Sequence, residues 1–217
     1  MEWGATSGDV LDFYRAAYLA DFRNEISGTR DTIQIDELRR RQNQRFSRVQ
    51  NSYEEFSGTR TGYEVSVLGD EVAAGNEESM LTVRTENATL YYVFASDQLF
   101  KIVVAYNSSY LGGLQFEAFL DQVERRYGPP AETEVDETVG QMRYLARALW
   151  TEDDTRLRVE NRSNLFGTYI MVFSDGPLED RVLQLRGAAT ASNSNQAVND
   201  LIQSISDGRN NRLDNSN

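Results

Sequence analysis

The sequence predicts an α+β protein in which an N-terminal helical hairpin is followed by an antiparallel sheet with helices packed on one face. Two observations lead to this fold class. Apolar residues recur at three- and four-residue spacing in residues 1–60, as in amphipathic helices, but at every second position in much of residues 61–188, as in strands. The predicted strands do not alternate regularly with helices, so antiparallel pairs are expected to dominate. Residues 189–217 are rich in Ser and Asn and are expected to form a flexible tail.

The helical hairpin is predicted from its start and stop signals. The first helix is expected to begin near Asp9, whose carboxylate can accept backbone N–H groups, and to end at Ser27-Gly28. The second is expected to begin at Asp31 or Thr32 and to end at Ser57-Gly58. Its face opposite the arginine residues must be covered by the sheet or by a partner. That apolar or neutral stripe consists of Ile35, Leu38, Gln42, Phe46, Val49, Tyr53 and Phe56.

Four strands are expected next, and their alternation predicts which side chains share a face. The last two form a hairpin across Ser96-Asp97-Gln98. Alternation places Leu90, Tyr92 and Phe94 on one face, and likewise Phe100, Ile102, Val104 and Tyr106. Lys101 lies within the last strand and is expected to project to solvent. The predicted strands are Tyr63–Leu68, Met80–Thr85, Thr89–Ala95 and Leu99–Tyr106.

The second half of the sheet region is expected to begin with a helix. That helix has Phe116, Phe119, Leu120, Val123 and Tyr127 on one face and stops at Gly128-Pro129-Pro130. An acidic loop, Ala131–Gly140, should follow. The remaining elements are predicted as the strands Gln141–Trp150, Thr155–Asn161 and Gly167–Phe173 and a short helix, Leu178–Leu185.

The amino-acid composition excludes several classes of chemistry. The chain has no histidine and no cysteine, and Lys101 is its only lysine. It therefore has no imidazole base, no Ser–His–Asp triad, no thiolate nucleophile and no thiolate metal ligand. The net charge of −12 disfavours binding to nucleic acid, whose phosphates require a basic surface. No Gly-rich phosphate-binding motif is present, and no cofactor is expected.

Carboxylate chemistry stays open as an alternative. A glycoside hydrolase needs two suitably spaced carboxylates and no histidine, so a carboxylate-dependent hydrolase acting on glycans is the runner-up function. The acidic runs Glu152-Asp153-Asp154 and Glu132–Glu137 lack the spacing of a calcium-binding loop, and no metal site is assigned to them.

Aromatic residues on or beside the predicted strands carry the functional hypothesis. Most are expected to form core and cross-strand pairs, but Tyr and Trp also make strong contacts at interfaces. Tyr91 and Tyr92 are adjacent in one strand and must point to opposite faces, so one of them lies off the main core. The candidate binding residues are Tyr53, Phe56, Tyr91, Tyr92, Tyr110 and Trp150.

The segment Arg126-Tyr127-Gly128-Pro129, followed by a strand ending in Trp150, resembles small α+β domains of bacterial envelope proteins. The resemblance assigns no family, but it implies a periplasmic or extracellular location, with a cytoplasmic location as the alternative. No run of apolar residues is long enough to span a bilayer.

These observations together predict a non-catalytic bacterial binding or assembly domain that acts as a scaffold. It is expected to bind a protein partner, or to self-associate, through the helical hairpin and an aromatic sheet face. A third possibility is a pocket for a small apolar ligand beneath the sheet.

Overall fold

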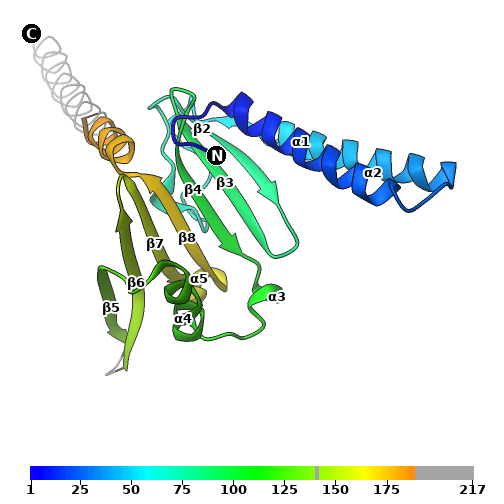
Figure 1. Cartoon of the computed structure of the whole chain (residues 1–217). Coiled ribbons are helices and arrows are strands. Elements are labelled where there is room, and N and C mark those ends of the chain that lie inside the picture. The colour runs from blue at the N-terminus through cyan, green and yellow to red at the C-terminus, as the bar shows by residue number, and fades with distance from the viewer. Residues whose placement is uncertain (140–141, 189–217) are drawn as a thin grey trace, which may run out of the picture. The chain divides into compact units, whose positions relative to one another are not determined.

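The helical hairpin is present in the computed structural model, which describes residues 1–139 and 142–188 (Figure 1). Its helices are α1 (Ser7–Ile26) and α2 (Thr32–Gln50). The N-cap of α1 is Thr6 and not Asp9 as predicted: the Thr6 hydroxyl accepts from the Asp9 N–H, and the Asp9 carboxylate accepts from the Thr6 N–H. This reciprocal capping box satisfies two backbone donors, so the helix starts nearer the N-terminus than predicted, at Ser7. Asp31 caps α2, as predicted.

The second helix ends at Gln50, before the predicted stop at Ser57-Gly58. The hydroxyl of Ser52 donates to the backbone oxygen of Thr82 and accepts from its N–H, both at 2.9 Å. This hydroxyl joins the chain to the edge of the sheet immediately after the helix, so Tyr53 and Phe56 lie outside it. A side-chain to backbone bond of this kind competes with continuation of a helix and is not encoded by apolar periodicity.

Eight antiparallel strands form one sheet in the order β1-β2-β3-β4-β8-β7-β6-β5. Two four-stranded meanders therefore meet where β4 pairs with β8, and each meander follows its own helical segment. The predicted α+β class is confirmed. The strands are β1 (Glu54–Glu55), β2 (Glu78–Arg84), β3 (Ala88–Ala95), β4 (Gln98–Tyr106), β5 (Glu132–Val139), β6 (Met142–Glu152), β7 (Thr155–Arg162) and β8 (Thr168–Asp175). The further helices are a 3-10 turn η1 (Gly69–Glu71), α3 (Ser108–Leu111), α4 (Phe116–Tyr127), α5 (Ser163–Phe166) and a helix at 176–188.

The predicted hairpin between β3 and β4 is confirmed, with one change of register. Leu90 lies opposite Val104, and Tyr92 lies opposite Ile102, as alternation requires. An irregularity after Val93 then pairs Phe94 with Leu99. Leu99 therefore joins the apolar cluster of this face in the place predicted for Phe100. A bulge shifts every following side chain by one position, which the alternation of a single strand does not reveal.

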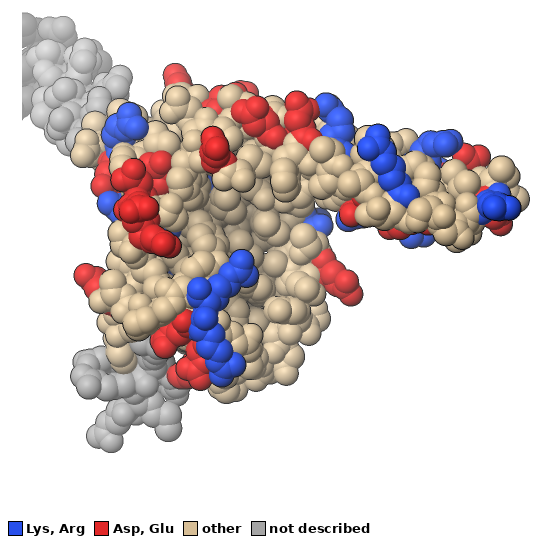
Figure 2. Space-filling view, viewed as in Figure 1, with Lys and Arg blue, Asp and Glu red and all other residues tan. Residues whose placement is uncertain are grey.

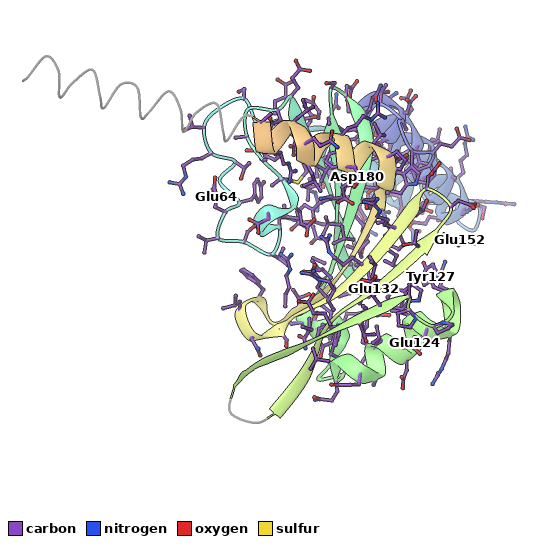
Figure 3. The ribbon with its side chains drawn as sticks, turned by 90° about the vertical axis from the view of Figure 1, so that its left-hand side faces the viewer. Glu64, Glu124, Tyr127, Glu132, Glu152 and Asp180 are labelled. Atoms are coloured by element: carbon purple, nitrogen blue, oxygen red, sulfur yellow. The ribbon has the colours of Figure 1, made fainter. Side chains whose placement is uncertain are left out.

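Helices cover one face of the sheet in two places. Over the first meander, Val10, Tyr18 and Val49 of the hairpin pack against β2 and β3. Over the second, Phe116, Phe119 and other apolar residues of α4 pack against β6, β7 and β8. Figures 1 and 3 show α4 and the hairpin on the same side of the sheet. The surface that remains between them lies over β4 and β8, at the centre of the sheet.

The segment 56–77 lies on the opposite side, where Figure 3 labels Glu64. The predicted strand Tyr63–Leu68 is wrong, because this segment consists of turns and bends and the η1 turn. Its polar side chains bond to nearby backbone groups: the Glu64 carboxylate accepts from Thr61 N–H at 2.8 Å, and Ser66 donates to the Tyr63 oxygen at 2.7 Å. Such local bonds offer the backbone an alternative to a sheet ladder.

The predicted acidic loop at 131–140 is also corrected, because residues Glu132–Val139 form β5. This strand pairs only with β6 and is the outer strand of its half. Charged side chains suit an edge strand, since they oppose pairing with a second molecule. The acidic residues of this segment were interpreted as a sign of a loop, although acidic residues are equally compatible with a strand at the edge of a sheet.

Residues 1–179 make up one compact unit, which includes both the hairpin and the sheet, and a second unit begins at residue 180. Of the second unit, the structure describes residues 180–188, which belong to a helix at 176–188 that includes the predicted Leu178–Leu185. The predicted flexible tail, 189–217, lies outside the described residues. None of the described helices is both long and apolar enough to cross a membrane.

Candidate functional site

The six candidate binding residues divide into a buried group and an accessible group. Phe56, Tyr92 and Trp150 are 3%, 6% and 7% exposed and belong to the core. Tyr53 and Tyr110 are 37% and 53% exposed. Tyr91 is half-buried and, with Tyr53, lines a hollow beside the hairpin, whereas Tyr110 lines a separate hollow beside α4. The structure therefore does not bring the six together in one surface.

The buried members have structural partners that explain their burial. The Tyr92 hydroxyl lies 2.7 Å from the hydroxyl of Tyr14 on α1, and this bond joins the hairpin to β3. The indole N–H of Trp150 donates to the backbone oxygen of Gly128 at 2.8 Å, just after α4. Both polar groups are satisfied inside the core, as buried Tyr and Trp require. These residues hold the helices on the sheet.

The hollow beside α4 has a volume of about 510 Å³, and we call it the tyrosine groove. Its floor comes from the two central strands, because Tyr106 ends β4 and Phe173 lies on β8. The Tyr106 ring stacks on Tyr110 with centroids 5.8 Å apart, and the Tyr127 ring meets Phe173 at 6.2 Å. The lining residues are Tyr106, Tyr110, Leu111, Leu114, Phe119, Gln122, Val123, Arg126, Tyr127, Met171 and Phe173.

The polar groups of the tyrosine groove are the hydroxyls of its three tyrosines, the Gln122 amide and the Arg126 guanidinium. The Tyr106 hydroxyl donates to the sulfur of Met171 at 3.3 Å, and burial raises the pKa of Tyr106, so this hydroxyl stays neutral at physiological pH. The Arg126 guanidinium lies 5.5 Å from the centroid of the Tyr127 ring. In Figure 2 charged side chains gather on the hairpin and around α4, while the surface between them is largely uncharged. The groove thus combines aromatic and aliphatic side chains with the tyrosine hydroxyls, Gln122 and one cation.

A second hollow of about 560 Å³ lies at the end of the hairpin next to the free part of the β2 edge, and we call it the arginine pocket. Strand β1 pairs with Ser79 and Met80 of β2, and the Phe56 N–H donates to the Glu78 oxygen. At the other end of the same edge, Thr82 bonds to Ser52 beside the pocket. The lining residues are Tyr18, Arg45, Arg48, Val49, Asn51, Ser52, Tyr53, Glu54, Tyr63, Thr82, Arg84 and Tyr91.

The prediction that Lys101 projects to solvent is wrong. Lys101 is 2% exposed, and its ammonium lies 2.9 Å from the Glu71 carboxylate and 3.0 Å from the Glu179 carboxylate. Arg158 and Arg162 also pair with Glu71. Lys101 was expected to be solvated, but it shares its strand face with the buried Val103 and Ala105. Segment 56–77 lies over this face and brings the Glu71 carboxylate to the lysine. We call this set the buried ion cluster; its members are Glu71, Lys101, Arg158, Glu160, Arg162 and Glu179.

The buried ion cluster is a structural feature with a predictable dependence on pH. Burial by itself would raise the pKa of Glu71, but the charges of Lys101 and Arg158 outweigh it and hold that pKa below its ordinary value of 4.5. Because the folded-state pKa is lowered, the stabilisation from Glu71 is present above about pH 4.5 and is lost as the pH falls through the folded-state pKa.

The Glu71→Gln variant is therefore expected to be about 2–3 kcal/mol less stable than the wild type at neutral pH, because charge-assisted hydrogen bonds are lost. This difference should shrink as the pH falls below 4.5 and through the lowered folded-state pKa of Glu71, where the wild-type carboxylate in the folded protein becomes protonated. Urea unfolding at a series of pH values measures both quantities. A difference that stays constant down to acid pH would contradict the assigned role of Glu71.

A third hollow, of about 440 Å³, is lined by four carboxylates. Each of these accepts a hydrogen bond from a nearby group: Glu78 accepts from the Ala73 N–H at 3.0 Å and Glu77 from the Ser96 hydroxyl at 2.7 Å. Asp97 accepts from the Ser7 N–H at 2.9 Å and Glu55 from the Tyr53 hydroxyl at 3.3 Å. These contacts connect β2, the β3–β4 turn and the start of α1, so the carboxylates stabilise the fold locally.

Other acidic residues are spread over separate elements. Figure 3 shows Glu64 on the far side of the sheet from Glu124 of α4 and from Glu152 at the end of β6. Among the described residues, no group of three or more carboxylates is close enough together to hold a metal ion.

Several residues of the two hollows were missed in the sequence. Tyr106 and Tyr127 were assigned to apolar faces, and Tyr63 to a strand, because their spacing fits those elements. Arg84 is the last residue of β2, and nothing in the sequence around it indicates that it lines a pocket. The groove could have been suspected from the number of tyrosines near the ends of predicted helices and strands, where a side chain is often only half-buried.

Tyrosines line both of these accessible hollows. Four tyrosines line the arginine pocket and three line the tyrosine groove, out of eleven in the chain. No known protein family, curated protein sequence or solved structure matches this chain, so the chemistry of these surfaces is the basis for assigning a function.

Proposed function

We propose that this chain is a non-catalytic binding domain that holds a segment of a protein partner in the tyrosine groove. The observation that supports it is the exposure of Tyr110 and Tyr127, at 53% and 38%, over a hollow built on the two central strands. Tyr side chains lose little conformational entropy on binding and bury a large area, which makes them frequent contributors of interface energy.

The form of the groove suits a peptide segment that carries large apolar side chains. Phe119, which is 5% exposed, meets the Tyr106 ring at 5.1 Å and fixes the position of that ring on the groove floor. A rigid floor needs little reordering when a partner binds, so more of the contact energy appears as affinity. Arg126 at the side of the groove would pair with a carboxylate in the partner segment.

The polar groups of the groove support binding in preference to catalysis. None of the described lining residues is a carboxylate, and the raised pKa of Tyr106 leaves its hydroxyl protonated. A hydrolase acting on glycans requires two carboxylates on either side of the bond to be cleaved. A small apolar ligand, the further alternative, would occupy the same hollow of about 510 Å³.

The test is a selection of peptides from a random display library on the full-length protein. We expect enriched peptides with large apolar residues, whose affinity falls about 30-fold in the Tyr110→Ala variant, equivalent to about 2 kcal/mol. Tyr53→Ala is the matched control, because Tyr53 is also an exposed tyrosine but lines the arginine pocket and not the tyrosine groove. The proposal fails if no enriched peptide depends on Tyr110, or if both variants lose affinity equally.

Self-association through the same groove is distinguished by light scattering over a concentration series. A second copy as the partner predicts a dimer in the wild type and a monomer in Tyr110→Ala. A separate protein partner predicts monomers for both proteins.

A further inference from the structure

The arginine pocket concentrates positive charge in a chain whose net charge is −12. Arg45 and Arg48 lie in the last two turns of α2, and Arg84 is the last residue of β2. The end of the helix and the end of the edge strand meet here because Ser52 bonds to Thr82. Three guanidinium groups from two distant parts of the sequence therefore surround one hollow.

Two of these guanidinium groups have no carboxylate partner among the residues that the structure describes. Within the described part of the chain, no Asp or Glu lies within ion-pair distance of Arg48 or Arg84, and Arg45 is paired only with Asp21, at 3.5 Å. Glu54 is the single carboxylate among the described lining residues. It is already engaged, because it accepts from the Tyr63 hydroxyl at 3.0 Å. The pocket thus carries an excess of positive charge.

The buried ion cluster provides a contrast within the same molecule. There, Arg158 and Arg162 face the carboxylates of Glu71 and Glu160 and are neutralised by them. In the arginine pocket the fold brings cations together without supplying equivalent anions. Local positive potential in a hollow attracts anions even when the chain as a whole is acidic.

Tyrosine rings form the rest of the wall. The Arg45 guanidinium lies 4.4 Å from the centroid of the Tyr18 ring, a cation–π contact that orients the arginine. Burial raises the pKa of Tyr91, and burial together with the bond to Glu54 raises the pKa of Tyr63 to about 12. Both hydroxyls therefore remain neutral, and Tyr91 can donate a hydrogen bond to a bound anion.

We infer that the arginine pocket binds a small oxyanion attached to a ring, that is, a phosphate or carboxylate carried by a sugar or an aromatic base. The guanidinium fork of arginine matches the geometry of both oxyanions. Tyrosine faces contact the apolar face of a sugar or stack on a base. The volume of about 560 Å³ lies within the usual range for small-molecule sites. This inference does not depend on the tyrosine groove.

Isothermal titration calorimetry on the full-length protein at low salt tests the inference. The probes are AMP, glucose 6-phosphate, glucuronate and inorganic phosphate. We expect at least one of the three ring-bearing probes to bind about tenfold or more tighter than inorganic phosphate, and the tightest of them identifies the kind of ring and oxyanion. Amide NMR shifts should then be concentrated around Ser52, Thr82 and Tyr91.

The double variant Arg48→Gln/Arg84→Gln is expected to weaken binding at least tenfold while leaving the unfolding temperature unchanged, because both arginines are exposed. The control is Arg40→Gln/Arg41→Gln, which makes the same change of net charge at exposed positions of α2 outside the pocket. The inference is overturned if no probe binds, if inorganic phosphate binds as tightly as every ring-bearing probe, or if the two double variants weaken binding equally.

Discussion

Replacing Lys101 with methionine is expected to lower the free energy of unfolding by about 3–5 kcal/mol, because it leaves buried carboxylates without their central cation. The Lys101 ammonium lies 2.9 Å from Glu71 and 3.0 Å from Glu179, and all three residues are buried. Arg158 and Arg162 would remain beside Glu71, but the Ser174 hydroxyl and a distant Arg156 would be the remaining partners of Glu179. The loss of stability is therefore expected to come mainly from Glu179, which would lose its closest cation.

Urea unfolding followed by circular dichroism measures this effect. The control is Arg41→Met, which removes an exposed cation and should change stability by less than about 0.5 kcal/mol. The double variant Lys101→Met/Glu71→Gln should be more stable than the sum of the single changes predicts, since the two groups interact directly. A loss of stability in Lys101→Met no larger than in the control would show that the lysine is solvated.

Replacing Trp150 with alanine is expected to lower the free energy of unfolding by about 3–5 kcal/mol, as for other buried large-to-small changes. Trp150 is 7% exposed, belongs to the apolar cluster beneath α4, and donates to the Gly128 oxygen that follows this helix. Its loss would leave a cavity and an unsatisfied backbone oxygen at the same place.

Trp150→Phe separates these two contributions. It keeps most of the buried ring and removes the N–H, so we expect a smaller loss of about 1–2 kcal/mol. Circular dichroism is the appropriate measurement, because the substitution removes one of the two tryptophans. If Trp150 formed a binding surface instead, Trp150→Ala would leave stability nearly unchanged and abolish binding of the selected peptides.

The elements that the sequence predicted correctly are those with local signals. Alternation of apolar residues located β3 and β4, and Gly128 marked the end of α4. Such signals act over a few residues and need no knowledge of distant partners. Two of the wrong predictions lie where a long-range contact prevails over the local pattern. At the end of α2, Ser52 bonds to Thr82, and in β4 the buried Lys101 pairs with Glu71.

The candidate site was only partly predictable for the same reason. Aromatic content near strands indicated Tyr53, Tyr91 and Tyr110, which line the two hollows. It could not distinguish them from Phe56, Tyr92 and Trp150, because the packing of a helix on the sheet decides which ring is covered. Nor could it show that Arg84 lies next to the end of α2.

The sequence by itself therefore determined the fold class, the helical hairpin, most strands and the chemistry that this chain lacks. These follow from composition and from periodicity, which reflect the geometry of single helices and strands. Only the tertiary structure decided that Lys101 is buried, that tyrosines gather in two hollows, and that three arginines share one pocket. The physical reason is that burial and electrostatic environment depend on which segments pack together. Segment 56–77, for example, packs on strands that are distant from it in the sequence.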